Sequence, residues 1–137
     1  MLDIHLKIVG VLMFGLVVIN VFAPARFGWR KEMAKVSLLT RQVFFVHCFF
    51  IALLVGMWGV LCLFFTSTLL EPTSLAALVL AGLTVFWGIR LFMQLFVYDK
   101  RLWRGHRFNT VMHVVLSAVW LYFTAVYGVA FWLQLNA

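Results

Sequence analysis

Four long apolar runs, separated by short polar segments, dominate the pattern of the 137-residue sequence. They cover roughly residues 4–23, 42–66, 74–97 and 109–133. A helix needs about 20 such residues to cross the ~30 Å hydrocarbon core of a bilayer. The runs are continuous and do not alternate between polar and apolar positions, which argues against the strands of a β-barrel. The pattern therefore predicts four transmembrane helices.

Residues at the boundaries of the runs predict where the helices begin and end. Pro24 is expected to end the first helix, because a proline removes a backbone hydrogen bond and clashes with the preceding turn. Thr73 or Ser74 is expected to cap the N-terminus of the third helix. The second and third runs are joined by a short connection, which favours antiparallel neighbours. We expect one all-α domain over residues 1–137, a four-helix transmembrane bundle with up-down-up-down topology.

The composition excludes an ordinary soluble domain. Hydrophobic residues make up 66% of the chain and charged residues 11%, whereas soluble domains are about half apolar and a quarter charged. No small-residue cleavage pattern follows the first run, so we expect a retained helix and not a removed signal peptide. Cys48 and Cys62 fall on one predicted helix, ~21 Å apart at helical rise, which is too far for a disulfide.

The positions of the basic residues predict the orientation of the chain. Five Lys or Arg residues lie in segment 25–41 and four in segment 98–108, whereas the opposite ends of the runs offer only Lys7. The positive-inside rule then makes both basic segments cytoplasmic loops and places both termini outside. This distribution explains the net charge of +7 without nucleic acid, and it makes anionic inner-leaflet headgroups an expected partner. We expect an integral protein of the bacterial cytoplasmic (inner) membrane, with periplasmic or external termini.

The first basic segment is open to two interpretations. Trp29, Met33, Val36 and Leu39 recur among its cations at a spacing typical of a short amphipathic helix lying at the inner headgroups. The same residues also fit the cytoplasmic beginning of a long second helix. The sequence favours neither interpretation over the other.

Polar side chains recur at one depth near the cytoplasmic side of the predicted bundle. His47 lies about five residues into the second run and His113 about four residues into the fourth. Arg90 lies about seven residues before the end of the third run, at a similar level. The remaining members of this predicted polar layer are Gln94, Asn20 and Ser117.

Arg90 is the member of this layer whose placement in lipid costs the most free energy. A guanidinium keeps its charge at any ordinary pH, so in lipid it must reach the headgroups, form a pair or meet an anionic ligand. No Asp or Glu lies within the four runs at that depth, and the nearest acid on the same side is Asp99. An intramembrane arginine without an acidic partner marks a functional-site hypothesis, and its alternative is simple snorkelling.

The two histidines favour a haem hypothesis. The second and fourth helices run in the same direction, so His47 and His113 could face each other across the bundle as axial ligands of a haem b iron. Arg90 would pair with a propionate, and Ser117 or Asn20 would orient a ring nitrogen. The protein would then transfer electrons, to or from quinone, as a subunit together with other membrane subunits of a larger complex.

Two alternatives remain open from the same residues. The layer could bind a quinone or another lipid-like ligand whose oxygens contact His and Arg side chains, and Trp87 and Trp120 lie deep enough to line it. It could equally be structural, fixing helix register in an accessory or scaffold subunit. The sequence contains no GxSxG, HExxH or phosphate-binding glycine loop, so we do not expect an enzyme that acts by itself.

Overall fold

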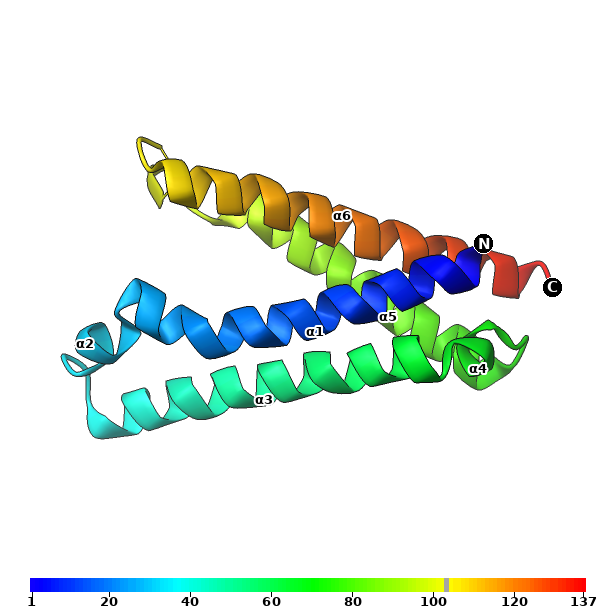
Figure 1. Ribbon diagram of the computed structural model, residues 1–137, viewed down its shortest axis with the longest axis horizontal. Coiled ribbons are helices and arrows are strands. Elements are labelled where there is room, and N and C mark those ends of the chain that lie inside the picture. Colours follow the sequence, from blue (N-terminus) through cyan, green and yellow to red (C-terminus); the bar gives the residue numbers. More distant parts are fainter. Residues whose placement is uncertain (103) are drawn as a thin grey trace. The chain divides into compact units, whose positions relative to one another are not determined.

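The protein was analysed as a computed structural model, which describes residues 1–102 and 104–137 (Figure 1). Every regular element among these residues is helical, with no strand. In chain order the elements are α1 (Leu2–Phe27), α2 (Trp29–Met33), α3 (Leu38–Phe64), α4 (Thr66–Leu70), α5 (Ser74–Phe92), the π-helix η1 (Met93–Val97), the 3₁₀-helix η2 (Lys100–Leu102) and α6 (Arg107–Leu135).

Four of the described helices are long and apolar enough to cross a membrane. They are Leu2–Phe27, Leu38–Phe64, Ser74–Val97 (α5 with η1) and Arg107–Leu135. This confirms the predicted all-helical chain with four helices of membrane-spanning length. The up-down order of the helices in a membrane and the side on which the termini lie remain predictions.

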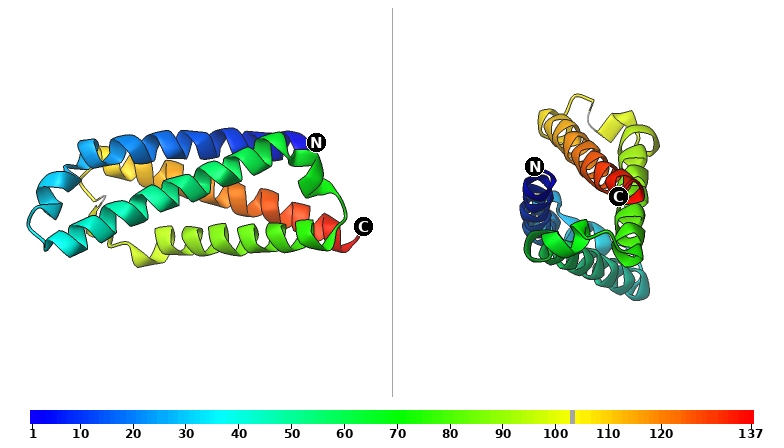
Figure 2. Two further views of the ribbon diagram at one scale, coloured as in Figure 1. Left: turned by 90° about the horizontal axis from the view of Figure 1, so that it is seen from below. Right: turned by 90° about the vertical axis from the view of Figure 1, so that its right-hand side faces the viewer.

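The chain divides into two compact units, residues 4–66 and residues 1–3 with 67–137. In the 4–66 unit, α1 and α3 lie side by side (Figure 2). Gly10 of α1 and Gly59 of α3 meet where the two helices pack closely. A Cβ added at Gly10 would lie 3.0 Å from the backbone oxygen of Gly59 and 3.0 Å from the backbone nitrogen of Leu63. The absence of side chains at these glycines lets the two helix backbones approach each other.

The connection between α1 and α3 corrects one expectation and refines another. α1 continues through Pro24 to Phe27, so the expected end at this proline was wrong. A proline near a helix end removes one backbone bond without stopping the helix, and membrane helices tolerate this. The first basic segment then forms the separate five-residue helix α2. α3 begins at Leu38 after the cap Ser37, whose side chain accepts a hydrogen bond from the Thr40 backbone nitrogen at 3.2 Å.

In the 67–137 unit, α5 and α6 form an antiparallel pair built on two matching contacts. The sequence T-x-x-[WY]-G occurs once on each helix, at residues 84–88 and 124–128. A Cβ added at Gly88 would lie 3.7 Å from the Thr124 methyl carbon, and one added at Gly128 would lie 3.7 Å from that of Thr84. Each threonine thus faces the glycine of the other helix, with room there for a methyl group.

Hydrogen bonds stabilise the end of this helix pair at which α5 begins and α6 ends. The side chain of Thr73 caps α5 by accepting a hydrogen bond from the Ala76 backbone nitrogen at 3.1 Å, as one of the two expected caps. Near the end of α6, the Gln134 amide donates to the backbone oxygens of Leu69 at 3.0 Å and Glu71 at 2.6 Å. These bonds close the pair where α5 begins and α6 ends. A polar cluster lies toward the opposite end of the pair.

Candidate functional site

A buried polar cluster joins η1 to α6. The amide nitrogen of Gln94 lies 3.0 Å from Nδ1 of His113, and the indole nitrogen of Trp120 donates to the amide oxygen of Gln94 at 3.4 Å. Gln94 is only 4% exposed. One glutamine therefore connects two side chains of α6 that lie two turns apart, and two of the predicted site residues are in direct contact.

The backbone around Gln94 departs from the α-helix. Residues Met93–Val97 form a π-helix, which closes with the Tyr98 backbone nitrogen donating to the Met93 oxygen at 3.4 Å. A π-helix accommodates extra chain within a helix and rotates the following residues, and such segments are frequent at functional sites. Gln94, which contacts His113, lies within this π-helix.

The hydrogen bonds of Gln94 favour one tautomer of the neutral His113 imidazole. The Trp120 indole N–H can only donate, so the Gln94 atom that faces it is the amide oxygen. The Gln94 amide nitrogen then faces His113 and donates to Nδ1, which therefore carries no hydrogen. In the neutral imidazole the hydrogen is then on Nε2. His113 is accordingly a donor at Nε2, and an iron ligand at that atom would need the opposite tautomer.

Arg90 is held between two aromatic rings. Its guanidinium carbon lies 5.2 Å from the Trp120 ring centroid and 5.7 Å from that of Tyr98. Both distances are within cation–π range. Among the described residues no carboxylate forms an ion pair with Arg90. The cluster thus stabilises this cation through aromatic faces and not through an acid.

Asp99, the nearest acid to Arg90 on the same side, forms its ion pair with another residue. Asp99 forms an ion pair with Arg101 at 3.0 Å and accepts a hydrogen bond from the Arg101 backbone nitrogen at 2.8 Å. That backbone bond and then the side-chain bond from Arg101 hold the pKa of the Asp99 carboxyl below its ordinary value. Asp99 therefore pairs with Arg101 just after the third candidate span. It does not compensate the positive charge of Arg90.

Aromatic side chains form the apolar wall next to the cluster. The rings of Trp87 and Trp120 stack with centroids 5.0 Å apart and an interplanar angle of 18°. The Phe123 ring meets Trp87 edge to face at 4.9 Å. All three side chains are buried. These contacts hold Trp120 in the orientation from which it reaches both Gln94 and Arg90.

Ser117 lies between the polar and aromatic parts of α6, one turn after His113. Its hydroxyl oxygen is buried and has no hydrogen-bond partner among the described residues. An unsatisfied hydroxyl in an apolar setting costs free energy unless a water or a ligand supplies the partner. Of the six predicted site residues, Arg90, Gln94, His113 and Ser117 thus belong to the 67–137 unit.

The other two predicted site residues belong to the 4–66 unit. Nδ1 of His47 lies 2.8 Å from the backbone oxygen of Val43, and the Asn20 amide donates to the backbone oxygen of Leu16 at 2.9 Å. Each of these side chains thus bonds a carbonyl of its own helix. Because a carbonyl only accepts, Nδ1 of His47 carries the hydrogen and Nε2 presents a lone pair. Whether all six residues form one layer remains a prediction.

The cluster of the 67–137 unit favours ligands that accept hydrogen bonds. Arg90 and the Ser117 hydroxyl can both donate hydrogen bonds. Among the described residues no group of three or more His, Cys, Asp or Glu side chains is placed to hold a metal ion. Comparison of the chain with protein-family models, curated proteins and solved structures found no match.

Proposed function

We propose that this integral membrane protein binds the ring of an isoprenoid quinone at the cluster of Arg90, Gln94, His113, Ser117 and Trp120. A quinone ring is flat and apolar on its faces, and its two carbonyl oxygens only accept hydrogen bonds. The observation that carries the proposal is the set of donors at the cluster beside an aromatic wall. Apolar and aromatic side chains with a few placed polar groups are the composition typical of small-molecule sites.

Each residue has a distinct part in this proposal. Arg90 donates to one ring oxygen, and its charge favours the negative charge that this oxygen gains when the quinone is reduced. Gln94 and Trp120 act as positioning residues, because together they favour one tautomer of His113. Ser117 supplies a further hydroxyl donor. The isoprenoid tail would lie among the exposed apolar side chains that face lipid.

A fluorescence titration tests this proposal. The protein is placed in phospholipid nanodiscs, and a short-chain ubiquinone analogue is added while tryptophan emission is recorded, since Trp87 and Trp120 line the cluster. We expect saturable quenching that Arg90→Gln weakens by about tenfold or more, as for hydrogen bonds to charged groups. Arg104→Gln, which removes the same charge from an exposed residue, is the matched control. Linear, unsaturable quenching, or equal affinities for the two variants, would refute quinone binding at this cluster.

A second candidate function is haem b binding for electron transfer, and the geometry of His47 favours it. Metal-bound histidines commonly donate their other ring N–H to a backbone carbonyl, as His47 does to Val43. For His113 to act as the second axial ligand, the Gln94 amide would have to reverse so that Nδ1 donates. A reduced-minus-oxidised visible spectrum should then show a haem α-band, lost in both His47→Ala and His113→Ala. A spectrum without this band in haem-supplemented protein excludes the candidate.

The third interpretation assigns the cluster a structural part in an accessory subunit. It predicts that neither quinone nor haem binds, and that substitutions in the cluster alter only stability and assembly with other membrane subunits. The two ligand assays above therefore distinguish all three functions.

A further inference from the structure

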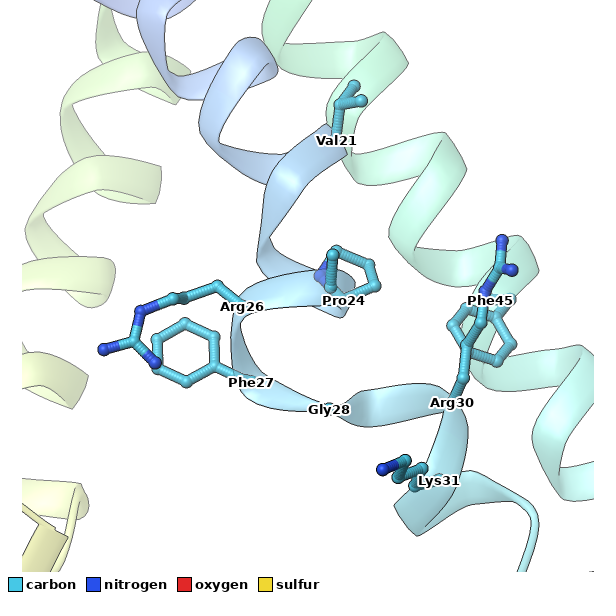
Figure 3. A pocket seen from close by; sticks show the side chains of 9 residues that line it. Val21, Pro24, Arg26, Phe27, Gly28, Arg30, Lys31 and Phe45 are labelled. Carbon is cyan, nitrogen blue, oxygen red and sulfur yellow. The ribbon is translucent and has the colours of Figure 1, made fainter.

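The 4–66 unit contains a separate polar feature, a pocket of about 1000 Å³ at the turn from α1 into α2 (Figure 3). Its charged lining comes from Arg26, Arg30 and Lys31, and no carboxylate contributes to it. Its apolar lining includes Val21 and Phe45. The pocket thus has one cationic wall and one apolar wall.

The turn that shapes the pocket is held in place by local contacts. Gly28 adopts a left-handed conformation, with φ of 65°, which favours glycine. Its backbone oxygen accepts a hydrogen bond from the Lys31 nitrogen at 3.1 Å, which starts α2. The Trp29 ring packs edge to face on Phe44 of α3, with centroids 5.4 Å apart. α2 is therefore anchored to α3 and presents its cations from a fixed position.

Arg30 and Lys31 form the cationic wall that a ligand would meet. Neither forms an ion pair among the described residues, and the neighbouring Glu32 does not line the pocket. Arg26 lies on the other side of the turn, with its guanidinium 5.9 Å from the Phe27 ring, and Figure 3 shows it extending away from Lys31. Arg30 and Lys31, which are consecutive in the sequence, line the pocket together with apolar side chains. Such a lining matches a ligand with an anionic group joined to a hydrophobic part.

We propose that this pocket binds the phosphate headgroup of an acidic phospholipid. Arg30 and Lys31 would contact the phosphate, and the first part of an acyl chain would lie along Val21 and Phe45. These apolar residues belong to α1 and α3, two of the four helices that are apolar enough to cross a bilayer. The pocket lies at the end of α1 and within the first turns of α3. If these helices cross a bilayer, the headgroups lie near this level. This inference is independent of the proposed quinone site.

Native mass spectrometry of the full-length protein in a neutral detergent tests the proposal. The probes are phosphatidylglycerol, phosphatidylcholine and inorganic phosphate. We expect saturable binding of phosphatidylglycerol, weakened about fivefold for each cation removed and about 25-fold in Arg30→Gln/Lys31→Gln. The double variant Lys100→Gln/Arg104→Gln removes the same charge from the second basic segment and should bind like the natural protein. If Arg30→Gln/Lys31→Gln does not fold, Lys31→Gln alone should show the fivefold loss.

Three results would overturn this inference. Equal loss in both double variants would show unspecific attraction to the net charge of the protein. Equal affinity for phosphatidylcholine would show that the negative headgroup is not recognised. Inorganic phosphate binding as tightly as phosphatidylglycerol would identify a free anion, and not a lipid, as the ligand.

Discussion

At the scale of single residues, Gln94 organises the polar cluster. Its amide contacts His113 through the nitrogen and Trp120 through the oxygen. In an apolar interior, a donor or acceptor that loses its partner costs more than the bond itself contributes. The cluster therefore depends on an amide at this position and not only on a side chain of similar size.

Replacing Gln94 by leucine tests this dependence. Gln94→Leu leaves the Trp120 indole N–H and Nδ1 of His113 without their glutamine partner, so we expect the free energy of unfolding to fall by about 1–2 kcal/mol. Unfolding by a denaturing detergent, followed by circular dichroism, measures the change. Asn136→Leu is the control, because this exposed amide bonds only the Trp132 oxygen of its own helix. Similar losses in the two variants would contradict the role assigned to Gln94.

Asp99 allows a prediction about pH. The pKa of its carboxyl is lowered in the folded protein, first by the Arg101 backbone N–H and then by the Arg101 side chain. Its stabilising contribution is therefore fully present above the ordinary value of about 3.9 and is lost as pH falls through the lower folded value. Because the backbone bond is the larger cause, Arg101→Gln should leave the pKa below the ordinary value. Carboxyl ¹³C chemical shifts against pH measure this, and an ordinary pKa in the natural protein would refute the arrangement.

At the scale of elements, the sequence predicts the four long helices well and their irregularities poorly. Run length and continuity identify the helices because a lipid core imposes both. Pro24 was misread, because one lost backbone bond near a helix end does not stop the helix. The π-helix at Met93–Val97 leaves the apolar pattern unchanged, so hydropathy could not reveal it.

The candidate site shows the same contrast between what the sequence predicts and what it does not. The sequence predicts Arg90, Gln94 and His113 as members of one polar layer because such groups are costly in lipid, but it does not predict the bond from Trp120 to Gln94. The spacing of His113, Ser117 and Trp120 at i, i+4 and i+7 could have placed Trp120 on the same face. The matching T-x-x-[WY]-G sequences on α5 and α6 were a second signal that hydropathy did not use.

Glycine substitutions test the helix contacts through one chemical change at three positions. Gly10→Ala places a methyl group 3.0 Å from backbone atoms of α3, which cannot yield, so we expect a loss of about 1–3 kcal/mol of stability. Gly88→Ala meets Thr124 at an ordinary 3.7 Å, and Gly82→Ala meets nothing within 4 Å, so both should be neutral or slightly stabilising. Detergent unfolding compares the three variants. A harmless Gly10→Ala would contradict the close approach of α1 and α3.

At the scale of the whole molecule, the distribution of charge predicts the orientation. Nine of the eleven Lys and Arg residues lie in the two connecting segments expected to be cytoplasmic, so both termini should face outward. Alkaline phosphatase fused after Ala137 should then be active in bacterial cells, and green fluorescent protein fused there should be dark. A fluorescent fusion with an inactive phosphatase fusion would place the C-terminus inside and reverse the predicted topology.

The most direct test of the central claim, a quinone held at the α5–η1–α6 cluster, is the quinone retained when the protein is purified from membranes. The protein is extracted in mild detergent, and the quinone per chain is measured by chromatography with ultraviolet detection for the natural protein, Arg90→Gln and Arg104→Gln. We predict a near-stoichiometric amount in the natural protein and in Arg104→Gln, and a loss of most of it in Arg90→Gln. A natural protein that carries no more quinone than an unrelated membrane protein of similar size, and that gains none when quinone is added before extraction, would contradict the claim.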